Sequence, residues 1–375
     1  MPGLLKNIDP NGLLEYSVVY TDRSLNHMSQ SFQTIINDVS KSLKGVYNAE
    51  SVIVVPGGGT YAMEAVARQF ATNKKCLVLR NGWFSFRWSQ IFERGGIPSQ
   101  EIVMKAQRLG NGSQSQFAPA DINEVINKIT TEKPNLVFAP HVETSSGIIL
   151  PDDYIRSVAD AVHSVGGMFV LDCIASGAIW VDMEDTGVDV LISAPQKGWS
   201  SSPAFGLVML SGKSREMITT TQSTSFSCDL NKWMEIMEAY ENGAHAYHAT
   251  MPTDAIKQFR NTIIETEAFG FENAQIKQQE LGDKVRRLLE AQGFKSVSAE
   301  GFQAPGVVVS YTEDKLIHNG SKFSSIGMQI AAGVPLQCDE GEDYQSFRIG
   351  LFGLDKLKDV DAAVKRLGNA IDQIK

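Results

Sequence analysis

The segment GMFVLDCIASGAIWVDMEDTGVDVLISAPQKGWSSSP (167–203) contains two short apolar runs, each followed by a polar residue with a possible chemical role. The runs GMFVLD (167–172) and DVLISA (189–194) are almost entirely apolar, which is typical of strands in a parallel sheet that is covered on both faces. Asp172 ends the first run, and Lys197 lies just beyond the second. Because neighbouring parallel strands deliver their carboxyl ends to one crevice, we expect Asp172 and Lys197 to lie close together.

The same pattern extends along the chain on both sides of this segment. Apolar runs rich in β-branched residues alternate with amphipathic stretches of helical length, which predicts a doubly wound α/β unit with a mostly parallel sheet from about residue 50 to 210. The further predicted strands are SVIVVP (51–56), KCLVLR (75–80), NLVFAP (135–140) and FGLVML (205–210), and the predicted helices include TYAMEAVARQFAT (60–72), PADINEVINKITT (119–131) and DDYIRSVADAVHSV (152–165).

The pattern changes after residue 252. A long helical stretch (254–292) is followed by the strand-like segments GVVVSY (306–311) and SFRIGLF (346–352) and by a terminal helix (359–374), which predicts a smaller α+β domain. We therefore predict three parts: an N-terminal segment that packs on the small domain (1–19), a large domain (20–253) and a small C-terminal domain (254–375).

The composition narrows the classes of function. The chain has 375 residues, is 43% hydrophobic and carries a formal net charge of −9. An acidic protein lacks the basic surface that nucleic acids and anionic membranes recruit. No apolar run reaches the roughly 20 residues of a membrane helix, and residues 1–20 do not read as a signal peptide, so we expect a cytoplasmic protein.

The four cysteines, Cys76, Cys173, Cys228 and Cys338, are far apart in the sequence. They form no C-x-x-C pair, and the six histidines show no metal-ligand spacing with them. We therefore expect reduced thiols and no metal site.

A glycine-rich turn offers a place for a phosphate. In PGGGTYAMEAVARQF (56–70) an apolar strand ends at Pro56, three glycines follow, and Thr60 opens a helix. Glycines let the backbone aim N–H groups at an anion, and the helix N-terminus adds partial positive charge. Such turns are also common in α/β folds without a phosphate, and this one lacks the G-K-[ST] ending of a nucleotide-binding loop.

Three charged residues complete the candidate set, each with a simpler structural alternative. Asp172 is either a carboxylate at an active-site rim or a turn aspartate, and Lys197 is either a crevice residue or a solvated surface lysine. Arg348, inside the apolar segment FRIGLF (347–352), requires an anion, which is either a substrate carboxylate or an acidic residue of the chain. Together with the glycine turn, these residues follow one another in the order that a phosphate-bearing aldehyde cofactor requires.

With these motifs in this order, the sequence resembles the class V aminotransferases of PLP fold type I, in particular the alanine–glyoxylate, serine–pyruvate and 2-aminoethylphosphonate transaminases. The resemblance covers nearly the whole chain from about residue 20. It implies a large doubly wound, mostly parallel-sheet domain, a smaller α+β C-terminal domain and the cofactor pyridoxal 5′-phosphate.

The resemblance also implies a role for individual residues around the cofactor. Lys197 matches the lysine that binds the cofactor as a Schiff base, and Asp172 matches the partner of the pyridine nitrogen. Phe84 in RNGWFSFR (80–87) matches the aromatic residue that stacks on the ring, with Trp83 as the alternative. The remaining matches are Gly58, Gly59, Thr60 and Gln196 at the phosphate, Thr144 of HVETSSGIILP (141–151) beside the ring, and Arg348 at the substrate carboxylate.

Two further matches imply a shared site. Tyr247 and Thr250 in AYHATMPT (246–253) match a segment that reaches the phosphate of the neighbouring subunit, which implies a homodimer. The N-terminal part departs from the family, because Asp22 and Arg23 stand where a G-H-R element is usual. Substrate specificity cannot be copied from a relative for this reason.

From the resemblance we expect a ping-pong transaminase that moves an amino group from a small amino acid or aminophosphonate to pyruvate or glyoxylate. For a phosphonate donor, Arg23 is a candidate for the additional cation. One alternative is a lyase or desulfurase of the same fold, for which Cys338 in LQCDEGEDYQ (336–345) would be the sulfur acceptor. A catalytically idle protein of this fold is the other alternative, although it would have no chemical need for Lys197, Asp172 and Arg348 together.

Overall fold

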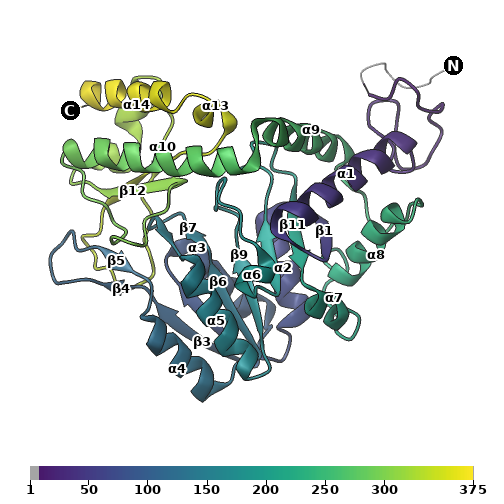
Figure 1. Ribbon diagram of the computed structural model, residues 1–375, viewed down its shortest axis with the longest axis horizontal. Coiled ribbons are helices and arrows are strands. Elements are labelled where there is room, and N and C mark those ends of the chain that lie inside the picture. The colour runs from purple at the N-terminus through teal and green to yellow at the C-terminus, as the bar shows by residue number, and fades with distance from the viewer. Residues whose placement is uncertain (1–7, 375) are drawn as a thin grey trace.

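A seven-stranded mixed sheet forms the centre of the computed structural model, which describes residues 8–374 (Figure 1). The strand order is β1-β11-β10-β9-β6-β2-β3, and β11 runs antiparallel to both of its neighbours while the pairs from β10 to β3 are parallel. The strands are β1 (Ser51–Pro56), β2 (Lys75–Arg80), β3 (Gln100–Lys105), β6 (Leu136–Pro140), β9 (Met168–Asp172), β10 (Val190–Ser193) and β11 (Phe205–Leu210).

The sequence correctly predicted six of these strands, to within a residue at each end. Every residue of β6, β9, β10 and β11 is buried, so helices and loops cover the sheet on both faces and the strands read as continuous apolar runs. The strand that was missed, β3, lies at the edge and is half-exposed along its length. Because β3 begins at Gln100 and ends at Lys105, it does not read as a continuous apolar run in the sequence.

Helices connect and cover the strands of this sheet. Helix α2 packs against β11 and β10, α3 against β2 and β6, α5 against β9, and α8 against β1. These first eight helices are α1 (Gln30–Tyr47), α2 (Gly59–Phe70), α3 (Trp83–Gly95), α4 (Ile122–Glu132), α5 (Asp152–Ser164), α6 (Met183–Thr186), α7 (Gly212–Ile218) and α8 (Leu230–Glu241).

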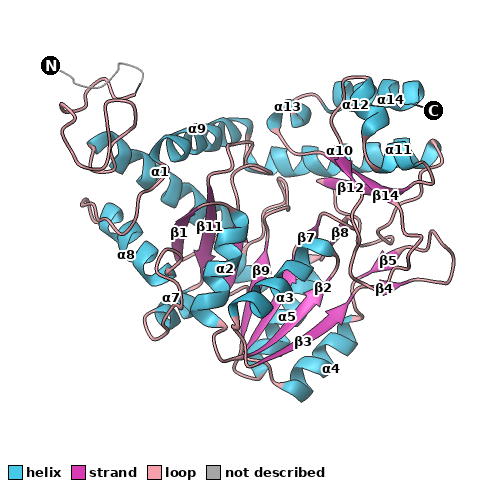
Figure 2. Cartoon of the chain, turned by 180° about the vertical axis from the view of Figure 1, so that it is seen from behind, coloured by secondary structure: helices cyan, strands magenta, loops and turns pink. Residues whose placement is uncertain are grey.

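A second, three-stranded antiparallel sheet stands apart from the first (Figure 2). Its order is β12 (Val307–Tyr311), β14 (Ser346–Gly350) and β13 (Ala331–Ala332). Helix α10 (Phe271–Ala291) packs against β12 and against the last helix, α14 (Val360–Ile374). The short elements that complete the chain are α11 (Lys315–His318), α12 (Ser321–Ser325), α13 (Leu354–Leu357), β4 (Gln107–Arg108), β5 (Phe117–Ala118), β7 (Val142–Glu143) and β8 (Ile148–Ile149).

The long helix predicted over 254–292 is two helices. Helix α9 (Thr253–Phe269) ends at Gly270, which has a φ of 91°, and α10 begins directly after it. A positive φ is accessible to glycine without strain, and glycine is the usual residue just beyond a helix. Helical periodicity on both sides of this glycine concealed the break.

The division of the chain into domains stays a prediction. Helix α9, which follows the predicted boundary, packs on α1 and places Ile256 and Phe259 in the core of the large sheet. In the described part of the predicted N-terminal segment, Ile8 contacts α9, because Lys257 Nζ donates a hydrogen bond to the Ile8 carbonyl at 2.8 Å. Figure 1 shows this segment at the opposite end of the molecule from the three-stranded sheet. Within residues 8–374, no helix is long and apolar enough to span a membrane.

Candidate active site

A cavity opens at the carboxyl ends of the parallel strands, where loops from five strands converge. It is the place where sheets of this kind bind their ligands, because the strand order reverses beside it. Of the eleven residues predicted to form the site, seven line this cavity. The lining consists of Gly59, Thr60, Met63, Phe84, Arg87, Pro140, Val142, Thr144, Asp172, Ile174, Ala175, Gln196 and Lys197.

The glycine turn between β1 and α2 forms one wall of the cavity. Helix α2 begins at Gly59, its N-cap Gly58 has no capping side chain, and no acidic residue stands in its first turn. A Cβ atom on Gly59 would lie 2.6 Å from Ile174 Cδ1. The backbone at Gly59 therefore comes closer to the loop after β9 than a residue with a side chain would permit. Helix termini of this kind present N–H groups that lack a partner within the helix.

Asp172 lies at the end of β9 and points into this cavity. It is 8% exposed, and one carboxylate oxygen accepts a hydrogen bond from the Ile174 N–H at 2.9 Å. Burial raises the pKa of Asp172 to about 6, the Ile174 hydrogen bond lowers the pKa, and the charge of Glu143 raises it again. A carboxylate in this environment gains strongly from a cationic partner.

Lys197 follows β10 in a loop that the packing of Trp199 holds in place. The next residue but one, Trp199, is 1% exposed, stacks near Trp180 with ring centroids 4.6 Å apart and donates a hydrogen bond to the Tyr47 hydroxyl at 3.2 Å. Between them, Gly198 leaves no room for a side chain, because a Cβ atom would lie 2.0 Å from the Gly177 carbonyl oxygen. This contact fixes the lysine loop against the loop that follows Asp172.

The amine of Lys197 is in no ion pair among residues 8–374. Its Nζ lies 5.5 Å from the centroid of the Phe352 ring. Burial lowers the pKa of Lys197 first, and the charge of Arg348 lowers it further, while Asp172 opposes both. An amine with a lowered pKa spends more time in the neutral, nucleophilic form at neutral pH.

Phe84 enters the cavity from the first turn of α3, which is held by a buried carboxylate from another loop. Glu143 is fully buried and accepts hydrogen bonds from the N–H groups of Phe84 at 3.2 Å and Ser85 at 2.8 Å. Ser145 donates to the same carboxylate through its N–H at 3.0 Å and its hydroxyl at 2.7 Å. Glu143 therefore caps α3 in place of the N-cap residue Gly82, which has no side chain.

The neighbours of Glu143 and Phe84 in the sequence lie on different sides of the cavity wall. Thr144 lies between Glu143 and Ser145 and lines the cavity, as its predicted position beside a ring requires. Trp83, the alternative to Phe84, is not among the lining residues and packs instead near Phe86, with centroids 5.8 Å apart.

Arg348 approaches the cavity from the three-stranded sheet. Its Nε donates to the Ala332 carbonyl at 2.8 Å, and its guanidinium carbon lies 5.5 Å from the centroid of the Phe84 ring. Burial lowers the pKa of Arg348, and the charge of Glu143 counteracts this shift. Because no acidic residue between 8 and 374 pairs with it within 4.0 Å, the predicted alternative of a salt bridge within the chain is wrong for the described residues.

The other predicted residues lie outside the cavity. Tyr247 is 54% exposed, and its hydroxyl is 3.1 Å from the Thr250 hydroxyl, but neither residue lines the cavity of its own chain. Arg23 is exposed, and its Nε lies 3.9 Å from Asp22 Oδ1. Cys338 is a free, buried thiol whose Sγ is 3.3 Å from the Arg80 carbonyl oxygen, and burial raises its pKa to about 12, which disfavours a nucleophilic thiolate.

Two charged residues at the cavity, Arg87 and Glu143, were not predicted from the sequence. Arg87 stands three positions after Phe84 in the same helix, a spacing that places both on one helix face, so this signal was present in the sequence. Glu143 adjoins Thr144, but nothing local predicts that its carboxylate reaches the start of α3.

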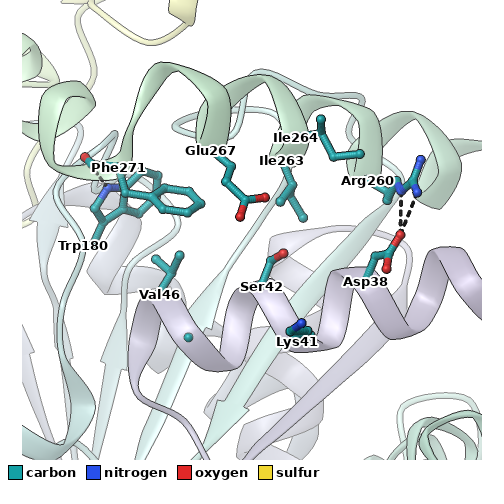
Figure 3. A pocket seen from close by; sticks show the side chains of 11 residues that line it. Asp38, Lys41, Ser42, Val46, Trp180, Arg260, Ile263, Ile264, Glu267 and Phe271 are labelled. Atoms are coloured by element: carbon teal, nitrogen blue, oxygen red, sulfur yellow. Dashed lines mark hydrogen bonds and ion pairs between the residues drawn. The ribbon is translucent and has the colours of Figure 1, made fainter.

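A second, wider cavity of about 650 Å³ lies between α1 and α9 (Figure 3). An ion pair between Arg260 and Asp38, at 2.7 Å, lies at one end, and Trp180 and Phe271 lie at the other. None of the predicted catalytic residues lines this cavity. The predicted catalytic residues Lys197 and Asp172 line the smaller cavity at the strand ends instead.

Comparison with known proteins identifies the family of the chain. Residues 12–315 match the family described as aminotransferase class-V. The 2-aminoethylphosphonate–pyruvate transaminase of Bacillus cereus is 27% identical over 333 residues, which cover 86% of this chain and 85% of that protein. A Synechococcus protein named soluble hydrogenase, small subunit, is 24% identical over 350 residues, or 92% of this chain and 86% of that protein.

The fold has counterparts among solved structures. The alanine–glyoxylate aminotransferase from Nostoc sp. superimposes with a TM-score of 0.79 at 21% identity, covering 93% of this chain and 89% of that one. The predicted fold, a doubly wound α/β sheet of PLP fold type I with a smaller α+β part, is confirmed.

The ionisation of Asp172 gives a test of the cavity that needs no ligand. Because its pKa is raised to about 6 in the folded protein, the stability it contributes is present below the unfolded pKa and is lost as the pH rises through about 6. Asp172→Asn removes this titration. In urea titrations of the ligand-free protein, the unfolding free energy of the variant should gain about 1 kcal/mol on wild type between pH 5 and pH 7.5. An equal difference at both pH values would contradict the raised pKa.

Proposed function

The chain belongs to the class-V aminotransferase family, and on this premise we propose that it moves an amino group from a small amino acid or aminophosphonate to pyruvate or glyoxylate. The family implies pyridoxal 5′-phosphate as the cofactor and a ping-pong order of reaction. Relatives named as 2-aminoethylphosphonate–pyruvate, alanine–glyoxylate and aspartate–glyoxylate transaminases support the proposed substrates.

One observation carries the proposal. Lys197, Asp172 and Phe84 line a single cavity although they come from the loop after β10, the end of β9 and the first turn of α3. The guanidinium of Arg348, which has no ion pair among residues 8–374, lies beside the same aromatic ring. An amine, a buried carboxylate, an aromatic face and an unpaired cation are the four groups that a pyridine aldehyde and an amino acid need from the protein.

The residues present fit the cofactor. Within residues 8–374 the buried side-chain oxygen of Gln196 has no hydrogen-bond partner, and the N–H₂ group of the same amide could donate to a phosphate. Gly59 and Thr60 line the cavity at the start of α2, which has no side-chain cap, and Gly58, Gly59, Thr60 and Gln196 would hold a phosphate there.

When bound, pyridoxal phosphate supplies an electron sink for the negative charge that develops at the substrate Cα. Lys197 would hold the cofactor through its amine, and the same amine would be the group that takes the proton from the substrate Cα. Asp172 would accept a hydrogen bond from the pyridine nitrogen and favour its protonated form, while Phe84 and Thr144 would orient the ring. Arg348 binds the substrate carboxylate, which fixes the direction of the Cα–H bond.

We also propose that the protein is a homodimer in which Tyr247 and Thr250 reach the phosphate on the neighbouring subunit. Both residues lie outside the cavity of their own chain, and Tyr247 is exposed. Exposed large apolar side chains at Leu13, Leu14, Tyr16 and Val18 support a partner on this part of the molecule.

The half-reaction tests the proposed function. Holo wild-type protein mixed with alanine or 2-aminoethylphosphonate should lose the absorbance of the aldehyde form and regain it on addition of pyruvate or glyoxylate, with release of the matching oxo product. Lys197→Ala should still bind the cofactor but slow this conversion by about 10³-fold or more, because it lacks the amine that moves the proton. A wild-type protein that returns the aldehyde form without an oxo acid would instead be a lyase.

Arg348→Lys tests the carboxylate site. The ammonium group keeps the charge but loses the two-donor fork, so we expect KM for the oxo acid to rise about 10-fold or more, with little change in the Kd of the cofactor. Steady-state kinetics with both substrates would measure this. An unchanged KM together with a lower Tm would assign Arg348 a purely structural role.

The dimer is tested by light scattering on the holo-protein at micromolar concentration. We expect a mass of two chains, and Tyr247→Phe should weaken cofactor binding without dissociating the dimer, since it removes only one hydroxyl. A fully active monomer would contradict the shared site.

A further inference from the structure

We infer that Arg87 is a second anion-binding residue of the cavity and that its guanidinium binds the phosphate of the cofactor. This inference rests on the proposed function, because it takes pyridoxal phosphate as the ligand. It concerns a residue that sequence analysis did not single out and that the structure brings into the cavity lining.

The position of Arg87 ties it to both the aromatic residue and the glycine turn. It follows Phe84 by three residues in α3, and its guanidinium carbon lies 5.2 Å from the centroid of the Phe84 ring. Its Nη1 donates a hydrogen bond to the Thr60 hydroxyl at 2.9 Å. Arg87 therefore stands where the first turn of α2 faces the first turn of α3.

The charges at this point do not balance within the chain. The start of α2 carries partial positive charge, and neither a capping side chain at Gly58 nor an acidic residue in the first turn offsets it. The guanidinium of Arg87 adds a full positive charge next to it. Two positive groups this close repel each other, and an anion between them would interact favourably with both.

No such anion comes from the described residues. Between residues 8 and 374, no carboxylate lies within ion-pair distance of Arg87, whereas Arg68, Arg156, Arg215 and Arg260 each pair with an acid. Asp172 acts on Arg87 only across the cavity, through its charge. The missing anion is therefore expected from a ligand.

The hydrogen-bond partners of Arg348 and Arg87 indicate that the two arginines bind different ligands. Arg348 is held by the Ala332 carbonyl of the three-stranded sheet, and Arg87 by Thr60 of the glycine turn. Both guanidinium groups lie near the Phe84 ring, at 5.5 Å and 5.2 Å from its centroid. The phosphate belongs at the glycine turn, so Arg87 is its cation and Arg348 remains for the substrate carboxylate.

A comparison of two ligands isolates the phosphate contact. Apo-protein is titrated with pyridoxal phosphate and with pyridoxal, which lacks the phosphate, and each Kd is read from absorbance. We expect Arg87→Gln to weaken the binding of pyridoxal phosphate by about 10- to 100-fold and to leave the Kd of pyridoxal within about twofold. Arg87→Lys should recover part of the loss, because it restores the charge without the fork.

Arg94→Gln is the matched control, since Arg94 is an exposed arginine of the same helix. It should leave both Kd values unchanged. Equal weakening of both ligands by Arg87→Gln would overturn the inference, because Arg87 would then only support Phe84 or the fold. An unchanged Kd for pyridoxal phosphate with a higher KM for the oxo acid would also overturn it, in favour of a substrate contact.

The proposed function fails in a different way. Wild-type protein that binds neither ligand would overturn the proposed function, and this inference with it. Wild-type protein that binds pyridoxal phosphate while Arg87→Gln binds it equally well would overturn the inference alone.

Discussion

The close contact between two loops, the one after β9 and the one after β10, is the constraint on which the site depends. The two strands pair in parallel with Ile192 opposite Asp172, so their carboxyl ends emerge side by side. The loops then approach until Gly198 leaves no space for a Cβ atom against the Gly177 carbonyl. The buried carboxylate of Asp172 and the half-buried amine of Lys197 reach one cavity because the two loops approach in this way.

The balance of charge in the cavity follows from this arrangement. Asp172 and Glu143 are buried acids, while Lys197, Arg87 and Arg348 are cations, and no ion pair among residues 8–374 joins an acid of this set to a cation of this set. The hydrogen bonds at the start of α3 satisfy Glu143, whereas Asp172 and the three cations have no ion-pair partner among these residues. A ligand that carries a phosphate at one end, a protonated ring nitrogen and a substrate carboxylate would supply the partners that the chain leaves out.

The sequence predicts much of the fold for one physical reason. Strands that are covered on both faces are nearly all apolar, and such a run can be recognised within its own segment, without knowledge of the strands beside it. The prediction of elements fails at the edge strand β3, which is half-exposed and therefore not continuously apolar. It also fails at Gly270, where a single positive φ divides α9 from α10. The convergence of Asp172 and Lys197 was predictable from parallel pairing. The capping of α3 by Glu143 was not, since the contact spans about sixty residues of sequence and leaves no local pattern.

The central claim is that Lys197 holds the cofactor, and reduction with borohydride followed by peptide mass spectrometry tests it most directly. Wild-type holo-protein is reduced, digested and searched for a pyridoxyl phosphate group on lysine. We predict that the modified peptide contains Lys197. Recovery of the group on a different lysine, or on none, would contradict the assignment and the mechanism built on it.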